Sequence, residues 1–364
     1  MNKIEILYNK WLALQPLKDE LQQRLDEKFI LEFNYNSNHI EGNTLTYGQT
    51  ELLLKFGEID GNAKMKDLED MKAHNLCLQI IKEEAKDKER PLTEYFIRNL
   101  HNTMLREDYQ ETKNGKTYTV HAGIYKTRPN SVITVTGERF EYASVEETPA
   151  LMSDLITWYN KEEKKKELSI IELATLFHYR YIRIHPFEDG NGRIARLLMN
   201  YILLKHDYPM IVIRTKDKQN YLKALYKCDS IVGKIPTDGA NANIKQINTF
   251  YNYIENIVIH EIETSIEYLT AKDNTFWWFD GEFIKFRSEN TSKILELLIQ
   301  QPNITIRSLS EKIGINKSAI QKQLKTLQDK GFITRISGKT NYWHISISCT
   351  TKKGGTKKKK RRYK

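Results

Sequence analysis

Apolar residues recur at intervals of three and four through most of the first 270 residues of this 364-residue chain. This spacing puts apolar side chains on one face of an α-helix, and only eight prolines in the whole chain could interrupt such helices. Residues 170–184, with the sequence IIELATLFHYRYIRI, are one such stretch. Because 40% of the residues are hydrophobic, these helices can bury a core. The sequence therefore predicts a mainly α fold for this part.

One segment inside the helical part has a different pattern. Residues 123–137, GIYKTRPNSVITVTG, contain a Pro-Asn turn followed by alternating β-branched residues. The alternation sets Val132, Thr134 and Thr136 against Ile133 and Val135. Such a pattern predicts a β-hairpin that projects from the helices.

The net charge of +10 is distributed unevenly. Residues 352–364 hold nine basic and no acidic side chains, and residues 291–346 hold nine basic and three acidic ones. The first 290 residues are therefore mildly acidic, so the basic character belongs to the C-terminal part. We expect residues 347–364 to be a solvated basic tail that attracts polyanions without specificity.

The cysteines and the absence of long apolar stretches indicate the compartment. Cys77, Cys228 and Cys349 lie far apart, which favours neither a disulfide framework nor a paired-cysteine metal site. The N-terminus lacks the apolar core of a signal peptide, and no stretch approaches the roughly 18 apolar residues of a membrane span. We therefore expect a cytoplasmic protein.

Residues 184–196, IHPFEDGNGRIAR, have the layout of a loop that leads into a helix. Gly190 and Gly192 let main-chain N–H groups approach a ligand without obstruction by a Cβ atom. A helix that begins near Asn191 adds its unpaired N–H groups and the positive end of its dipole. The stretch therefore predicts a phosphate-binding turn.

The charged and titratable residues of this turn suit transfer of a phosphate-containing group. Arg193 and Arg196 lie three apart, on one helical face, and offer planar donors to a polyphosphate. His185 can accept a hydroxyl proton at neutral pH. Asp189 supplies a hard oxygen for Mg²⁺, which bridges phosphates while it keeps several waters.

This stretch resembles the signature of the Fic family, His-x-Phe-x-Asp/Glu-Gly-Asn-Gly-Arg-x-x-Arg, and fills every fixed position of it. The resemblance covers about residues 30–265. It implies a helical bundle with a β-hairpin flap and an enzyme that moves AMP from ATP to a hydroxyl side chain of a target protein or of itself. The roles it implies are a base at His185, a core anchor at Phe187, a Mg²⁺ ligand at Asp189, contacts with the α- and β-phosphates at Gly190, Asn191 and Gly192, and contacts with the distal phosphates at Arg193 and Arg196.

The same resemblance assigns two further parts of the site. Residues 123–137 resemble the flap that holds the target segment by strand addition, although a hairpin here could also only shield the cleft. Tyr221 stands where family members place an aromatic ring near the adenine. An ordinary position in the core or on a helix surface is the alternative for this tyrosine.

Near the N-terminus, SNHIEGNT resembles the inhibitory Ser/Thr-x-x-x-Glu-Gly/Asn motif of regulated Fic proteins. Ser37 and Glu41 are four apart and share a helical face, and Gly42 can end that helix. A Glu41 carboxylate paired with Arg196 would occupy the place of the γ-phosphate. The resemblance therefore implies inhibition within the chain, with low resting activity.

Residues 291–346 read as three helices and a hairpin that turns at Gly338 and Lys339, which is typical of a winged helix. Gly314 separates the second and third helices, and Asn316 or Ser318 can cap the third. The buried face of the third helix is expected at Ile320, Leu324 and Leu327, and the basic face of helix and wing at Lys317, Lys322, Lys325, Arg335 and Lys339. Such a module can bind DNA or another protein.

We therefore expect residues 1–95 to carry the inhibitory motif, 96–270 the catalytic core, 271–290 a linker, 291–346 a small α+β winged helix and 347–364 the tail. The leading hypothesis is a protein adenylyltransferase that uses ATP and Mg²⁺. The alternatives are a DNA-binding regulator whose first part senses nucleotide, and a relative that uses another phosphate donor or removes AMP. A homodimer is expected only by analogy.

Overall fold

The computed structural model describes residues 2–113, 115–133, 139–270, 275–279, 282–284, 286, 288–336, 342–345 and 348–351. The chain divides into two compact units. The first contains residues 1–17 and 25–263, and the second contains residues 18–24 and 264–364. None of the described helices combines the length and the apolar character that crossing a bilayer requires.

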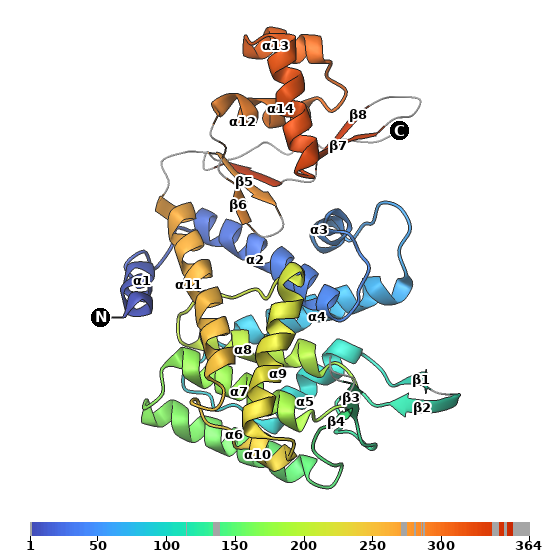
Figure 1. Cartoon of the computed structure of the whole chain (residues 1–364), viewed down its shortest axis with the longest axis vertical. Helices are drawn as coiled ribbons and strands as arrows, with labels where there is room; N and C mark the ends of the chain where they lie inside the picture. Colours follow the sequence, from blue (N-terminus) through green and yellow to red (C-terminus); the bar gives the residue numbers. More distant parts are fainter. Residues whose placement is uncertain are drawn as a thin grey trace. The chain divides into compact units, whose positions relative to one another are not determined.

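The first unit is mainly helical, as predicted (Figure 1). The α-helices between residues 3 and 270 are α1 (Lys3–Leu12), α2 (Asp19–Ile40), α3 (Tyr47–Phe56), α4 (Met65–Glu84), α5 (Glu94–Leu105), α6 (Thr148–Lys165), α7 (Ile170–Ile184), α8 (Asn191–Lys205), α9 (Lys218–Val232), α10 (Pro236–Ala240) and α11 (Asn248–Thr270), with a 3₁₀ turn at Thr215–Asp217.

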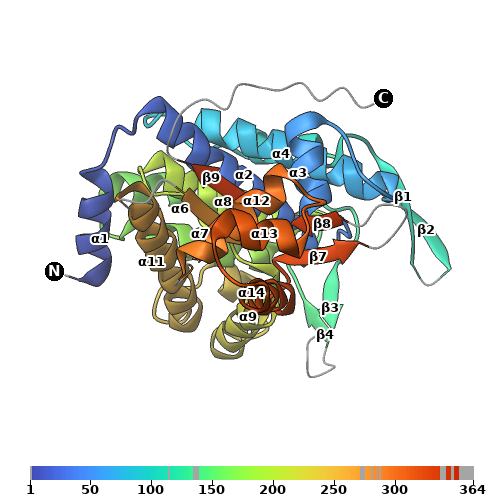
Figure 2. The ribbon, with the colours of Figure 1, turned by 90° about the horizontal axis from the view of Figure 1, so that it is seen from above.

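Helices α7 and α8 form the centre of this unit (Figures 1 and 2). They pack against each other, α7 also packs against α6 and α10, and α8 packs against α4. Nearly every residue of both helices is buried, so their ends hold a fixed relative position. Ser169 begins α7 with a capping box that includes Glu172. The short loop between the two helices, residues 185–190, is therefore anchored at both ends.

Two antiparallel hairpins project from these helices. Strands β3 (Ser131–Ile133) and β4 (Arg139–Glu141) pair with Val132 opposite Phe140. The hairpin overlaps the predicted segment only in part, because β3 lies inside residues 123–137 and β4 lies after them. Thr134, Val135 and Thr136 lie outside the described residues. Strands β1 (Tyr109–Lys113) and β2 (Lys116–Val120) form a second hairpin that the sequence did not indicate.

The second unit contains the predicted winged helix, with helices α12 (Glu289–Gln300), α13 (Ile306–Ile313) and α14 (Lys317–Asp329) and the paired strands β7 (Ile333–Ile336) and β8 (Tyr342–Ile345). Gly314 ends α13 in a left-handed conformation, and Asn316 caps α14 by accepting a hydrogen bond from the Ala319 N–H at 2.8 Å. Ile320, Leu324 and Leu327 are buried, as the spacing predicts.

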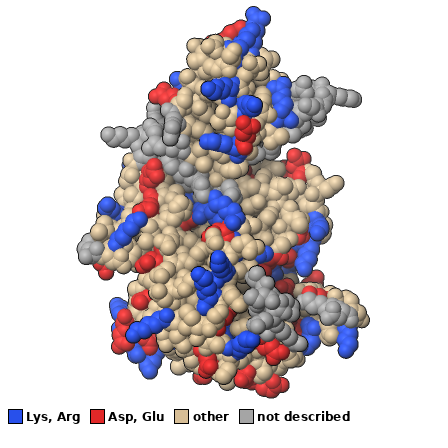
Figure 3. All heavy atoms as spheres, viewed as in Figure 1, with Lys and Arg blue, Asp and Glu red and all other residues tan. Residues whose placement is uncertain are grey.

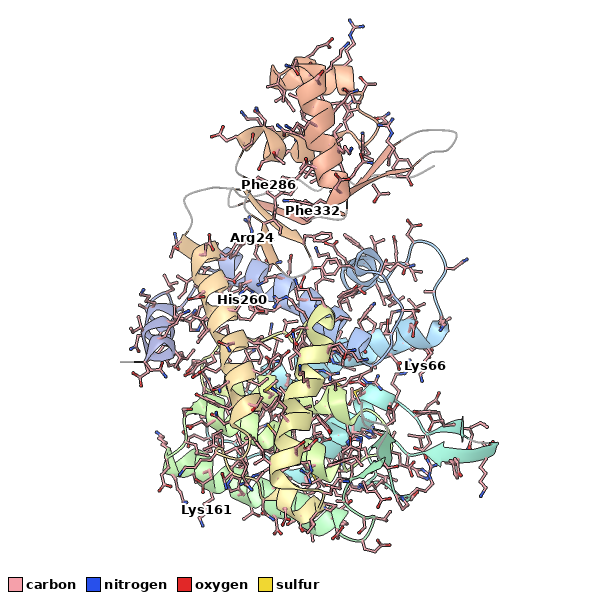
Figure 4. The ribbon with its side chains drawn as sticks, in the orientation of Figure 1. Arg24, Lys66, Lys161, His260, Phe286 and Phe332 are labelled. Atoms are coloured by element: carbon pink, nitrogen blue, oxygen red, sulfur yellow. The ribbon has the colours of Figure 1, made fainter. Side chains whose placement is uncertain are left out.

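The expected linker, residues 271–290, contains two strands, β5 (Thr275–Phe279) and β6 (Glu282–Ile284). They form a sheet with β9 (Ser348–Thr351) in the order β6-β5-β9. Trp277 of β5 is buried in the core of the winged helix, where Phe286 and Phe332 meet edge to face at 6.0 Å (Figure 4). The predicted turn at Gly338 and Lys339 and the tail after residue 351 lie outside the described residues.

Candidate active site

The loop between α7 and α8 takes its shape from two left-handed residues and one side-chain amide. His185 ends α7 at φ 52°, and Gly190 precedes α8 at φ 77°, where a Cβ atom would lie 2.3 Å from Met104 Cε. The Asn191 amide bonds Phe187 in both directions, since its Oδ1 accepts from the Phe187 N–H at 3.0 Å and its Nδ2 donates to the Phe187 carbonyl at 2.7 Å. The Asn191 side chain therefore fixes the loop, and its position leaves the main-chain N–H groups of α8 for a ligand.

His101 of α5 packs against the same loop and is hydrogen-bonded to it. Its ring stacks on Phe187 with centroids 3.7 Å apart and planes at 4°. Its Nε2 donates to the Asp189 carbonyl at 3.0 Å, and its Nδ1 accepts from the Gly123 N–H at 2.9 Å. Burial lowers the pKa of His101 to about 4, which agrees with a neutral ring that donates once and accepts once. The sequence analysis missed this residue, whose only signal is its place on the apolar face of α5.

The His185 ring stacks on an aromatic ring beside the loop. This ring is that of Tyr142, with ring centroids 3.9 Å apart and planes at 10°. Burial, followed by repulsion from Lys126, lowers the pKa of His185 to about 3. The imidazole is therefore neutral at physiological pH, which is the state in which it can accept a proton from a hydroxyl group.

The segment that leads into the β3–β4 hairpin is bonded to this loop. The Lys126 N–H donates to the Pro186 carbonyl at 2.8 Å, and Asn130 Nδ2 donates to the Phe187 carbonyl at 2.9 Å. Glu188 Oε1 accepts from Thr127 Oγ1 at 2.8 Å. Glu188, at a variable position of the motif, thus joins the loop to the segment that leads into the hairpin.

Asp189, just before Gly190 in the loop, carries an ionised carboxylate. Its oxygens accept from the Tyr109 hydroxyl at 2.8 Å and the Gly190 N–H at 2.7 Å, and Arg193 Nη2 lies 3.4 Å away. Burial acts to raise the pKa of Asp189, but Arg193 and these hydrogen bonds bring it below its usual value. The side chain remains 42% exposed, so a cation in solution can reach it.

Asp189 is the one carboxylate that this loop offers to a metal ion through the proposed phosphate site. This fits a Mg²⁺ ion whose other ligands come mainly from the substrate. No group of three or more His, Cys, Asp and Glu side chains is placed to hold a metal ion within the described part of the chain. One carboxylate with phosphate oxygens and water is a set that Mg²⁺ accepts. A single aspartate is therefore sufficient when a polyphosphate supplies further ligands.

Arg193 and Arg196 are buried at the start of α8, with 5% and 2% of their surface exposed. The Arg193 Nε–H makes no hydrogen bond with any residue that the structure describes, and its Nη1 lies 3.8 Å from Asp70. Buried donors without partners are unusual in proteins. Arg193 therefore has hydrogen-bonding capacity for an anion at this helix end.

Arg196 is bonded through its Nε and Nη2 to Ser37 of α2 and to Glu41, which follows this helix. Its Nε donates to Ser37 Oγ at 3.0 Å, and its Nη2 donates to the Ser37 carbonyl at 2.9 Å and to Glu41 Oε1 at 2.7 Å. A Cβ atom on Gly192 would lie 2.4 Å from Glu41 Oε1, so the carboxylate sits against the first turn of α8. The Glu41 carboxylate thus lies at the N-terminus of α8, where a negative charge is favoured. Gly42 follows at φ 95°, two residues after α2 ends.

Tyr221 of α9 lies in a buried aromatic cluster. It is 3% exposed, its hydroxyl is 3.1 Å from His178 Nε2, and its ring is 6.1 Å from that of Phe250. His178 is buried as well, and burial lowers its pKa to about 3. The structure therefore places the ring of Tyr221 in the core.

Comparisons with known proteins agree with this geometry. The model of the Fic/DOC family matches residues 91–203, and that of a winged helix-turn-helix DNA-binding domain matches residues 287–334. The chain is 26% identical over 276 residues to protein adenylyltransferase fic-1 of Caenorhabditis elegans, and 28% identical over 228 residues to protein adenylyltransferase Fic of Nematostella vectensis. These matches cover 75% and 62% of this chain and 48% and 49% of the relatives, so the chain spans about half the length of each.

A solved structure extends the comparison. The crystal structure of a Fic domain containing signaling protein from Bacteroides thetaiotaomicron matches with a TM-score of 0.70 and 58% sequence identity. The match covers 73% of this chain and 96% of that protein. Taken with the loop between α7 and α8, this similarity shows that the chain belongs to the Fic family.

Proposed function

We propose that this chain is a protein adenylyltransferase that transfers AMP from ATP to a hydroxyl side chain of a protein. The observation that carries the proposal is the grouping of a neutral imidazole, a glycine turn at a helix N-terminus and two buried guanidinium groups in one short loop. The relatives named as adenylyltransferases support ATP over other phosphate donors.

In the proposed reaction, His185 accepts the proton of the target hydroxyl as its oxygen attacks the α-phosphorus. The bond between the α-phosphorus and the bridging oxygen breaks, and pyrophosphate leaves. The N–H groups at the start of α8 would hold the α- and β-phosphates, with Arg193 and Arg196 on the distal phosphates. Asp189 would hold Mg²⁺, which supplies neutralisation of the phosphate charge.

The present arrangement corresponds to an inhibited state in this proposal. Glu41 pairs with Arg196 and lies against Gly192, where the γ-phosphate would otherwise be bound. Two anions cannot share that position without strong repulsion. ATP would then bind only in a displaced pose, with its α-phosphorus out of line with the target oxygen.

The donor is tested by incubating the purified Glu41→Gly chain, in which the proposed inhibition is removed, with Mg²⁺ and each of the four ribonucleoside triphosphates in turn. Mass spectrometry then locates the adduct on the chain itself or on a mixture of candidate proteins. We expect an AMP adduct with ATP alone. Adducts of equal yield with another nucleotide would contradict the choice of donor.

DNA is a second proposed partner, through the C-terminal unit. Lys317, Lys322 and Lys325 of α14 and Arg335 of β7 are exposed, and Lys and Arg side chains gather on this unit in Figure 3. The guanidinium of Arg335 lies 4.7 Å from the ring of Trp343 on the paired strand. A basic third helix beside a basic hairpin is the surface that winged helices present to DNA.

A charge-reversal experiment tests DNA binding. The double change Lys322→Glu and Lys325→Glu should weaken binding to duplex DNA and lower the salt dependence of the binding constant by about two units of slope. Lys293→Glu on α12, where the side chain is 57% exposed, is the control with the same kind of charge change. Equal affinity of the double variant and the control would exclude this surface.

A further inference from the structure

A buried histidine on α4 contacts the segment that carries Ser37 and Glu41. His74 has no exposed surface, and its two ring nitrogens face two residues of α2. Its Nδ1 is 2.6 Å from Asn34 Oδ1, and its Nε2 is 3.1 Å from Ser37 Oγ. The reaction proposed above does not use this residue.

The surrounding hydrogen bonds determine which nitrogen of His74 carries the proton. Asn34 Nδ2 already donates to the Ile30 carbonyl at 2.8 Å and to Asn75 Oδ1 at 2.9 Å, so Asn34 Oδ1 must be the atom that faces His74. Because that oxygen only accepts, His74 carries its proton on Nδ1. Burial, and then the nearby guanidinium groups, hold the pKa of His74 well below its usual value, so Nε2 keeps its lone pair.

This protonation state orients the Ser37 hydroxyl. The hydroxyl donates its one proton to His74 Nε2, and the lone pairs of Oγ then face the Arg196 Nε–H at 3.0 Å. The result is a chain of hydrogen bonds with one direction, from Arg196 through Ser37 and His74 to Asn34. It ends on the same guanidinium that Glu41 contacts at 2.7 Å.

We propose that His74 is a positioning residue of the inhibitory contact. By orienting Ser37, it holds the end of α2 against Arg196 and so keeps the Glu41 carboxylate over the start of α8. It would touch neither ATP nor the target protein. The proposal rests on the proposed inhibition by Glu41, and it adds a contact from α4 that stabilises the inhibited arrangement.

The test compares His74→Leu, His74→Gln and Ser37→Ala, each with and without Glu41→Gly, by incorporation of AMP and by melting temperature. His74→Leu removes both polar contacts, whereas His74→Gln keeps an acceptor that can reach Ser37. We expect His74→Leu to raise incorporation about fivefold, the ratio that corresponds to one net hydrogen bond. His74→Gln should remain near the unchanged chain. In the presence of Glu41→Gly, His74→Leu should give no further increase.

The outcomes separate this inference from the inhibition itself. If His74→Leu does not fold, Asn34→Ala should show a rise in the same direction, because Asn34 fixes the proton on His74 Nδ1. No rise with Asn34→Ala would then overturn the role of His74. If Glu41→Gly raises incorporation while Ser37→Ala and the folded His74 variants do not, inhibition stands and the role of His74 is overturned. If Glu41→Gly itself has no effect, the inhibition fails and this inference fails with it. A loss of activity by His74→Leu in both backgrounds would indicate a purely structural role.

Discussion

Glu41→Gly should raise AMP incorporation by about 10- to 100-fold, the range expected when a contact of a few kcal/mol between two sites is removed. The glycine leaves Arg196 without its carboxylate partner and uncovers the first turn of α8. Arg196 and the helix end then become available to the γ-phosphate. The measurement is the initial rate of incorporation from α-labelled ATP at equal protein concentration.

A matched control separates this effect from the loss of any ion pair. Glu69 pairs with Arg106 at 2.8 Å, and its side chain is 41% exposed, against 39% for Glu41. Glu69→Ala therefore removes a carboxylate of similar exposure whose partner, Arg106, is 45% exposed and has no part in the proposed phosphate site. It should leave the rate unchanged. A Glu41→Gly protein that labels no faster than the Glu69→Ala protein would remove the inhibitory role of Glu41.

His185→Ala, made in the Glu41→Gly protein so that a high rate can be followed, should lower incorporation by about 10²- to 10⁴-fold. The imidazole is the group proposed to accept the hydroxyl proton. The other imidazole bonded to this loop, that of His101, has both ring nitrogens engaged, by the Asp189 carbonyl and the Gly123 N–H. Affinity for ATP should change little, because the proposed phosphate contacts come from α8 and its arginines.

The control for this change is a histidine at the other end of α8. His206 follows α8 and lies 3.0 Å from Glu163, so His206→Ala removes an imidazole without touching the loop. It should keep the full rate. Incorporation by His185→Ala at the rate of His206→Ala would show that His185 is not the base.

Much of the fold follows from local patterns in the sequence. The spacing of apolar residues predicts α7 and α14, and the glycine turn predicts where α8 begins, because these elements depend on neighbours in the chain. Strands β5 and β9 could not be predicted in this way. They pair Trp277 with Cys349, residues that are far apart in sequence, and such pairing leaves no local signal.

Some residues of the candidate site could likewise be predicted from the sequence, and others could not. The spacing of Ser37 and Glu41 and the arginines of α8 could be read from the chain. The structure brings Ser37 of α2 and Glu41, the residue that follows α2, onto Arg196. His74 and His101 could not be identified, because each acts through contacts between helices distant in sequence. Tyr221 is buried beside His178, and its place near the adenine stays a prediction.

The most direct test of the account follows where the α-phosphate and the γ-phosphate of ATP go in a reaction with the Glu41→Gly protein. ATP labelled at the α-phosphate and ATP labelled at the γ-phosphate are compared under the same conditions with Mg²⁺. The account predicts that the α-label becomes covalently bound to protein while the γ-label leaves as pyrophosphate. Transfer of the γ-label to protein, or no transfer of either label, would contradict it.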